Sequence, residues 1–175
     1  MSIHRFERIQ IVPTSIEEAW AFFSNPANLS AITPPSLGFE IRSPLPTEMY
    51  PGLFVTYRVR PLLNIALEWV TEITHVEHQR YFIDEQRVGP YALWHHEHHF
   101  REVPGGVEMR DLLHYSVGFG PFGDAAVRFV VRPRIEAIFA FRTKVLNERF
   151  GVGSRPVDRR SSDSPIGTPA ASKIV

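Results

Sequence analysis

Cysteine is absent from the 175-residue chain. A disulfide scaffold, a thiol nucleophile and a cysteine-ligated zinc site are therefore all excluded. An excess of charge of one sign is also missing, because 19 Lys and Arg residues balance 19 Asp and Glu residues. The chain has no net charge that would attract nucleic acid or an anionic membrane surface, and we expect neither as a partner.

Long apolar runs are missing as well. No uninterrupted apolar segment approaches the length of a membrane span, so we expect no membrane insertion. The first eight residues mix charges of both signs and lead into no apolar run with a small-residue cleavage site, so no signal peptide is expected. These absences predict a cytoplasmic protein, and the lack of cysteine is compatible with a reducing compartment.

Aromatic residues and histidine are plentiful. There are 13 Phe, 5 Tyr, 3 Trp and 8 His residues, and four of the histidines lie in the segment His95-His96-Glu97-His98-His99. The chain length suits one domain. Residues 151–175 are rich in Gly, Ser, Pro, Asp and Arg and contain no aromatic residue. We therefore expect one folded domain over residues 1–150 and a disordered tail over residues 151–175.

Seven strands are predicted from apolar and polar alternation between turn residues. The last six follow one another at short intervals without intervening helices, which predicts an antiparallel meander. The predicted strands span residues 5–12, 38–43, 53–60, 65–77, 80–87, 91–102 and 106–117.

Three helices are predicted. A hydroxyl N-cap at Thr14-Ser15 starts a short helix that ends before Asn25-Pro26, and a second short helix covers residues 27–32. Asp124 is predicted to cap a long final helix that runs to about Phe150, and Pro133 should kink or split it. A sheet with helices confined to one side belongs to the α+β class.

This element order resembles the START-like, or SRPBCC, superfamily, which includes pollen-allergen-like proteins, polyketide cyclases and lipid-transfer domains. The resemblance covers residues 3–150 and is closest to a little-characterised bacterial branch of ligand-binding proteins. The segments that carry it are Ser24-Asn25-Pro26-Ala27-Asn28-Leu29, Ile32-Thr33-Pro34-Pro35, Leu67-Glu68-Trp69-Val70-Thr71-Glu72-Ile73, Phe82-Ile83-Asp84-Glu85-Gln86, Gly89-Pro90-Tyr91 and Trp94-His95-His96-Glu97-His98-His99-Phe100.

The resemblance implies a helix-grip (START-like) fold, in which a curved seven-stranded antiparallel sheet wraps around the long C-terminal helix. Two short helices follow the first strand, and a cavity lies between sheet and long helix. The implied partner is a hydrophobic small molecule such as a lipid, an isoprenoid or an aromatic polyketide-like compound. Members of the superfamily commonly function without a metal, so the resemblance implies neither a cofactor nor a metal.

The histidine-rich strand places its side chains alternately on two faces. Trp94, His96, His98 and Phe100 share one face, and the two aromatic residues predict that this face points inward. The turn at residues 103–106 places residue 102 opposite residue 107. In that register His98 lies opposite Asp111, His96 opposite Leu113 and Trp94 opposite Tyr115, so His98 and Asp111 are close enough to form a buried hydrogen-bonded pair.

Three interpretations of His96, His98 and Asp111 remain open. They form a satisfied polar network in the pocket wall, or the imidazoles orient a polar group of an apolar ligand, or the cluster carries chemistry. Chemistry would mean acid/base catalysis by His98 oriented by Asp111, or a metal site of two histidines and one carboxylate. The outward set of His95, Glu97 and His99 is a solvated face able to scavenge metal weakly.

Other residues are predicted to line the cavity if their strands keep the same inward register. Each aromatic residue among them could also pack in the apolar core without contacting a ligand. Asp84 and Glu85 point to opposite faces of their strand, and the sequence leaves open which one enters the cavity. Arg142 lies on the apolar stripe of the long helix, and snorkelling to solvent is favoured over an inward cation. The candidate ligand-binding residues are Trp69, Phe82, Trp94, His96, His98, Phe100, Asp111, Tyr115, Ile138, Phe139 and Arg142.

Three function classes are compatible with this sequence. The leading one is binding or carriage of a hydrophobic small molecule in an internal cavity. The alternative is a cyclase- or dehydratase-type enzyme in which His98, Asp111 and His96 transfer protons. The third is an interaction module whose pocket is filled by its own side chains. The oligomeric state is left undetermined.

Overall fold

The computed structural model describes residues 2–62, 65–118 and 120–153. Its main parts are a seven-stranded sheet and a long C-terminal helical segment. The C-terminal tail predicted over residues 151–175 lies outside the described residues from residue 154 onward. The strands are β1 (His4–Val12), β2 (Glu40–Ile41), β3 (Leu53–Leu62), β4 (Ile65–Glu77), β5 (Tyr81–Val88), β6 (Leu93–Val103) and β7 (Gly106–Ser116).

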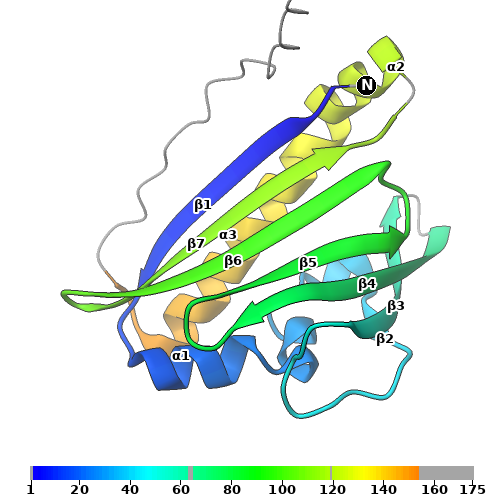
Figure 1. Cartoon of the computed structure of the whole chain (residues 1–175). Coiled ribbons are helices and arrows are strands. Elements are labelled where there is room, and N and C mark those ends of the chain that lie inside the picture. The colour runs from blue at the N-terminus through cyan, green and yellow to red at the C-terminus, as the bar shows by residue number, and fades with distance from the viewer. Residues whose placement is uncertain (1, 63–64, 119, 154–175) are drawn as a thin grey trace, which may run out of the picture.

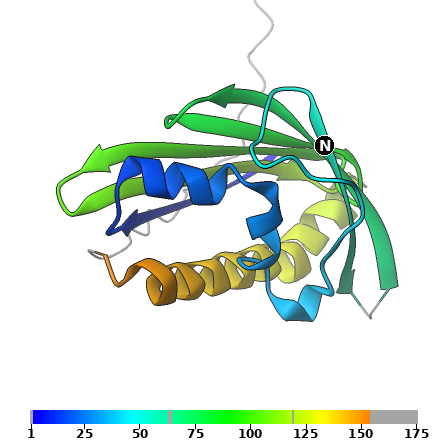
Figure 2. The same ribbon diagram turned by 90° about the horizontal axis from the view of Figure 1, so that it is seen from below.

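The sheet has the strand order β1-β7-β6-β5-β4-β3-β2, and all of its pairs are antiparallel. It curves, and the long helix crosses its concave side (Figures 1 and 2). The predicted meander is confirmed. The strand expected over residues 38–43 is reduced to the two residues of β2, because Gly38 at φ +52° ends the preceding turn and Pro44 cannot donate a backbone hydrogen bond.

A tight turn sets the register between β6 and β7. Gly105 and Gly106 have φ angles of +93° and +136°, which lie in the left-handed region that favours glycine. A Cβ atom on Gly106 would lie 2.1 Å from the carbonyl oxygen of Val12. The predicted register, with Glu102 opposite Val107, is confirmed.

The helical segments between β1 and β2 follow the prediction in part. Helix α1 (Ile16–Phe23) begins where expected, and the Oγ of Ser15 accepts a hydrogen bond from the Glu18 N–H at 3.2 Å. The second predicted helix, over residues 27–32, is a 3-10 helix, η1 (Pro26–Ser30), followed by the 3-10 turn η2 (Pro35–Leu37). Closely spaced prolines leave too few backbone donors there for an α-helix.

The long C-terminal helix starts earlier than predicted. Helix α2 (Gly120–Ala126) begins four residues before Asp124, which is not its cap. Asp124 instead accepts a hydrogen bond from the Ser2 hydroxyl at 2.9 Å and lies 3.3 Å from His4 Nε2. These contacts join the start of β1 to the helix.

A π-helical turn, η3 (Val127–Val131), separates α2 from α3 (Arg132–Phe150). Pro133 lies in the first turn of α3, where a missing backbone donor is tolerated. The widened turn before it is closed by a hydrogen bond from the Arg132 N–H to the Val127 carbonyl oxygen. The helical residues continue without a gap from α2 to the end of α3, so the helix is not split at Pro133, and the π-helical turn is the irregularity found before it.

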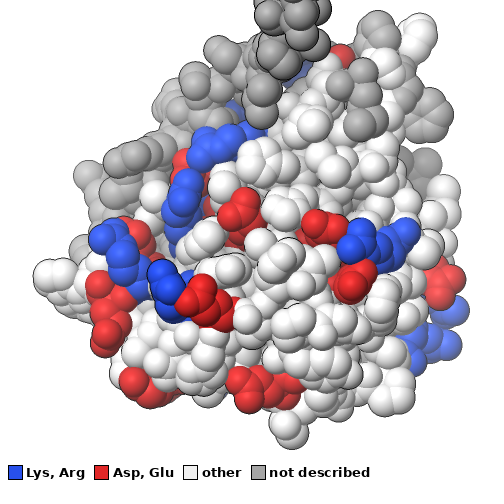
Figure 3. Space-filling view, viewed as in Figure 1, with Lys and Arg blue, Asp and Glu red and all other residues white. Residues whose placement is uncertain are grey.

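The apolar core lies between the concave face of the sheet and the helices. One cluster joins Trp20 and Phe23 of α1 to Phe100 of β6, and a second joins Phe6 of β1 to Phe139 of α3. Among the described residues, no helix is long and apolar enough to cross a membrane. The opposite face of the sheet carries ion pairs, and Figure 3 shows positive and negative side chains next to one another across this side of the molecule.

Candidate functional site

A cavity of about 190 Å³ lies between the inner face of the sheet, helix α3 and the 3-10 segments. Its wall is mostly apolar, with a small group of polar side chains, which is the usual composition of a small-molecule site. The aromatic side chains in its wall are Phe22, Phe23, Phe39, Tyr57, Trp69, Phe82, Trp94 and Phe139.

The charged and titratable side chains of the wall gather in one place. Asp84, His96, His98 and Arg142 line the cavity, and Asp111 lies directly behind the imidazoles. We call these five side chains the inner cluster. Asp111 and both imidazoles are buried, and Asp84 keeps 16% of its side chain exposed.

Three neighbouring strands supply the inner cluster. Asp84 on β5 pairs with His96 on β6, and His98 on β6 pairs with Asp111 on β7. Because side chains alternate along a strand, His96 and His98 share one face of β6. The predicted opposition of His98 and Asp111 is confirmed.

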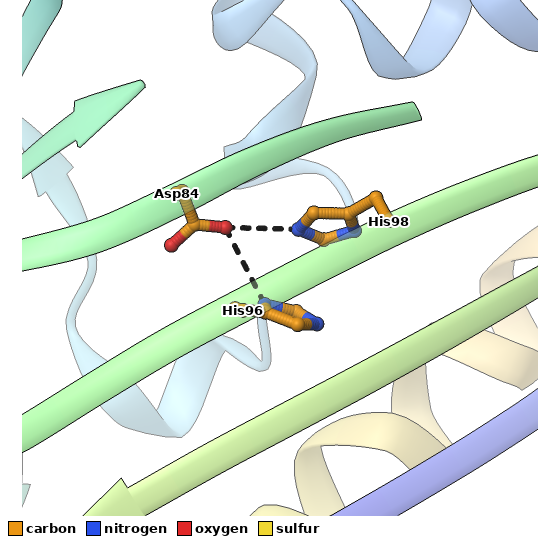
Figure 4. A group of neighbouring side chains, drawn as sticks. All are labelled: Asp84, His96 and His98. Atoms are coloured by element: carbon orange, nitrogen blue, oxygen red, sulfur yellow. Dashed lines mark hydrogen bonds and ion pairs between the residues drawn. The ribbon is translucent and has the colours of Figure 1, made fainter. Parts of the chain in front are cut away.

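Each imidazole lies between both carboxylates. The Nδ1 of His96 is 3.4 Å from Asp84 Oδ2, and its Nε2 is 3.1 Å from Asp111 Oδ1. The Nε2 of His98 is 2.9 Å from Asp84 Oδ2, and its Nδ1 is 2.8 Å from Asp111 Oδ1. The two ring centroids are 3.8 Å apart. Figure 4 shows Asp84 facing both rings.

The contact between His98 and Asp111 is an ion pair without hydrogen-bond alignment. His98 forms its hydrogen bond with Asp84, and His96 forms one with Asp111. The buried Nδ1 of His98 therefore has no hydrogen-bond partner among the described residues. The predicted hydrogen-bonded pair of His98 and Asp111 is replaced by a network that contains one further carboxylate.

Arg142 on α3 completes the inner cluster, so the favoured prediction that it snorkels to solvent is wrong. Only 8% of Arg142 is exposed. Its Nη1 donates to Asp111 Oδ1 at 3.3 Å, and its guanidinium lies 4.8 Å from the centroid of the Phe139 ring. A buried carboxylate opposite the helix holds the cation inward. The Nε of Arg142 has no hydrogen-bond partner.

The inner cluster shifts the protonation of its members. Burial opposes ionisation of Asp84 and Asp111, but hydrogen bonds and ion-pair contacts from His96 and His98 outweigh it and hold the pKa of each carboxyl well below its usual range. Burial also opposes the charged form of His96, but the two carboxylates outweigh it and raise the pKa of that imidazole. The ionised forms of Asp84, Asp111 and His96 thus favour one another.

The structure brings most of the predicted site residues together on the cavity wall. Phe100 is not on the wall and packs against Trp20 and Phe23, while Tyr115 is fully buried elsewhere in the core. Asp111 reaches the cavity only through the imidazoles. The predicted residues that line the cavity are Trp69, Phe82, Trp94, His96, His98, Ile138, Phe139 and Arg142.

Asp84 is the functional side chain that sequence reasoning left unassigned. The sequence placed either Asp84 or Glu85 in the cavity, and the structure places Asp84 there. A signal was present, because Asp84 is two residues from Phe82 and shares its face of β5. Phe82 was predicted inward, and it stacks on His98 with ring centroids 4.2 Å apart.

No protein-family model and no curated relative matches the chain. Solved structures do match it. Protein CV1439 from Chromobacterium violaceum is 8% identical with a TM-score of 0.64, and the match covers 85% of this chain and 98% of that one. Ara h 8.0201 is 14% identical with a TM-score of 0.54, and the match covers 83% and 99%. The chain has the helix-grip fold.

A third match is the di-domain ARO/CYC BexL from the BE-7585A biosynthetic pathway. It is 16% identical with a TM-score of 0.62, and the match covers 85% of this chain and 50% of BexL. At such identities the likeness shows the fold alone, so the chemistry of this helix-grip chain must be argued from its own cavity.

Proposed function

We propose that the chain binds a hydrophobic small molecule in the cavity between its sheet and α3, as a binding or carrier protein of the START-like, SRPBCC type. The observation that carries this proposal is the mostly apolar cavity with the inner cluster at one side. The aromatic wall would contact the apolar body of a ligand. Arg142 and His98, which line the cavity beside Asp84, would form hydrogen bonds with a polar group of the ligand.

The size of the cavity narrows the ligand. An apolar cavity of about 150 Å³ is enough to bind benzene, so the 190 Å³ of this cavity would enclose an aromatic ring system or part of an acyl or isoprenoid chain. A longer ligand would extend past the 3-10 segments and the turn between them, where Leu29, Ile32 and Leu37 line the cavity. A pocket filled by its own side chains, expected for a pure interaction module, is not what these residues form.

Native mass spectrometry of the freshly purified chain tests the proposal. We expect an extra mass of a few hundred daltons that is lost on denaturation. If the chain is bare, we expect 1-anilinonaphthalene-8-sulfonate, an aromatic anion, to bind it with one-to-one stoichiometry. A bare chain that also fails to bind this probe would contradict the proposal.

A matched pair of substitutions on α3 locates the binding. Ile138 lines the cavity, whereas Ala137 on the same helix is exposed. Ile138→Trp should fill the cavity and weaken binding of the probe by about tenfold or more, with Ala137→Trp as the control that binds as the wild type does. Equal binding by both variants would place the probe outside the cavity.

The inner cluster favours a second candidate, general acid–base catalysis of the cyclase or dehydratase type. Imidazoles held by carboxylates at the wall of an apolar cavity are suited to moving a proton on a bound ketone. Deuterium uptake at the α-carbon of acetophenone, a ketone whose uncatalysed exchange is slow at neutral pH, provides a simple assay. We expect uptake to be lost in His98→Ala and kept in His95→Ala, and equal uptake by the two variants would reject this candidate.

A further inference from the structure

Three donor atoms of the inner cluster converge at one point on the cavity wall. Asp84 Oδ2, His96 Nδ1 and His98 Nε2 all lie within 4.8 Å of one another (Figure 4). The carboxylate oxygen is 3.4 Å from the nitrogen of His96 and 2.9 Å from the nitrogen of His98. Metal–ligand bonds of about 2.0–2.2 Å place neighbouring donors about 3.0–3.5 Å apart. The carboxylate oxygen of Asp84 is thus close to the spacing of a coordination shell from each of the two nitrogens.

The opposite nitrogen of each imidazole faces a second carboxylate. His96 Nε2 lies 3.1 Å and His98 Nδ1 2.8 Å from the same oxygen, Asp111 Oδ1. Metal-bound histidines characteristically direct the other ring nitrogen to a carboxylate or carbonyl, which fixes the tautomer and orients the ring. A hydrogen bond to Asp111 would hold a proton on His96 Nε2, and the negative charge of Asp111 beside His98 Nδ1 would favour a proton there. His96 Nδ1 and His98 Nε2 would then present lone pairs toward Asp84.

The surroundings distinguish the roles of the two carboxylates. Asp84 lines the cavity with 16% of its side chain exposed, while Asp111 is 6% exposed and also accepts from Arg142. Asp84 is therefore the carboxylate that can reach an ion at the cavity wall, and Asp111 is the one that supports the rings from behind. One open interpretation of the sequence was a metal site with Asp111 as its carboxylate ligand. The geometry favours Asp84 in that role and places Asp111 behind the rings.

We propose that Asp84, His96 and His98 bind one divalent first-row transition metal ion, with zinc as the reference case, at the wall of the cavity. Two imidazoles and one carboxylate suit zinc, iron(II) and cobalt(II), whereas magnesium and calcium favour all-oxygen sites. Three protein ligands leave coordination positions that point into the cavity. A bound ligand with a carboxylate, hydroxyl or carbonyl group would reach the ion there.

Cobalt(II) provides the test on the full chain after chelator treatment and dialysis. We expect one equivalent to be retained and to give visible absorption bands of a nitrogen- and oxygen-ligated ion. Asp84→Asn and His98→Ala should each reduce cobalt affinity at least 100-fold, and Asp111→Asn should reduce it about 10–100-fold through the orientation of the rings. Circular dichroism confirms that each variant is folded.

The outer face of β6 supplies the matched control. His95, Glu97 and His99 lie there with Glu85, and the Nδ1 of His95 is 2.9 Å from Glu85 Oε1. His95→Ala and His99→Ala should leave cobalt binding unchanged. Binding that is lost in these two variants and kept in His98→Ala would overturn the proposal and assign the ion to the outer face. Absence of any retained cobalt would overturn it as well.

A measurement on the wild type guards against variants that do not fold. With zinc added, nitrogen-15 resonances of the ring nitrogens should report metal at Nδ1 of His96 and at Nε2 of His98, with protons on the opposite nitrogens. If both rings keep protons on the nitrogens that face Asp84 when zinc is present, the cluster is a hydrogen-bonded network without a metal, and the proposal is overturned. Binding of the apolar probe in metal-free protein is measured in parallel, because failure of the metal site leaves the cavity proposal standing.

Discussion

The two faces of β6 carry the same kinds of side chain in different surroundings. The side chains of His96 and His98 on the inner face are 6% and 9% exposed, and those of His95 and His99 on the outer face are 31% and 35% exposed. Both pairs contact carboxylates. Water screens the outer contacts, so each is worth little, whereas the inner groups have given up hydration and depend on one another.

This difference shows that a histidine-rich segment has no single meaning. Alternate residues of one strand belong to a solvated face and to a buried cluster, and the division follows from the period of two along the strand. The function of such a segment is therefore argued one residue at a time. Substitutions that remove the same chemical group from each face measure how far the two faces differ.

The largest difference in stability between the two faces should appear when a carboxylate is removed from each. Asp111→Ala removes the partner of two imidazoles and one guanidinium, and we expect the free energy of unfolding to fall by about 3–5 kcal/mol. Glu97→Ala on the outer face should lower it by about 1 kcal/mol or less. Urea unfolding at neutral pH measures both. Similar losses in the two variants would mean that the inner cluster is hydrated.

A smaller difference is expected between two cations of α3. Arg142→Met leaves the Asp111 carboxylate without one charged donor and should lower the free energy of unfolding by about 2 kcal/mol. Lys144 is exposed and pairs with Glu148 at 3.8 Å, so Lys144→Met should cost about 0.5 kcal/mol or less. If thermal or urea unfolding ranks them the other way, Arg142 does not stabilise the cluster.

The smallest effect lies on the outer face and depends on pH. Burial opposes ionisation of Glu7, but hydrogen bonds from Arg110 and Arg5 outweigh it and lower the pKa of this carboxyl below its ordinary value of 4.5. A lowered pKa in the folded state stabilises the fold above pH 4.5 and loses its contribution as the pH falls. Glu7→Gln should cost about 1 kcal/mol at neutral pH and nothing in strong acid. A loss independent of pH would point to packing instead.

The sequence was sufficient to predict the sheet and the pairing of β6 with β7. Alternation chose the inward face, and the short glycine turn at residues 103–106 fixed the register, so that the order of residues alone places His98 opposite Asp111. A tight turn leaves few alternative registers, which is why this part of the site was predictable.

The position of Asp84 was harder to predict, because the tight turn between β4 and β5 fixes the pairing only next to the turn and the register then shifts. β5 and β6 are joined through residues 89–92, and the pairing of β4 with β5 shifts register twice. Arg142 raised a different difficulty. The sequence shows that Arg142 lies on the apolar stripe of the helix. Only the structure shows that the buried carboxylate of Asp111 on the sheet contacts it. Contacts between distant elements decided both positions.

In the helix-grip arrangement, separate parts of the chain also supply the inner cluster and much of the apolar wall of the cavity. Residues 82–111, on three adjacent strands, hold the inner cluster except for Arg142, whereas segments within residues 22–49 and helix α3 form much of the apolar wall. Mutations in the 22–49 segment can reshape the space for a ligand while leaving the charged groups in place. A library that varies this segment alone would therefore change the shape of the cavity while leaving the inner cluster unchanged.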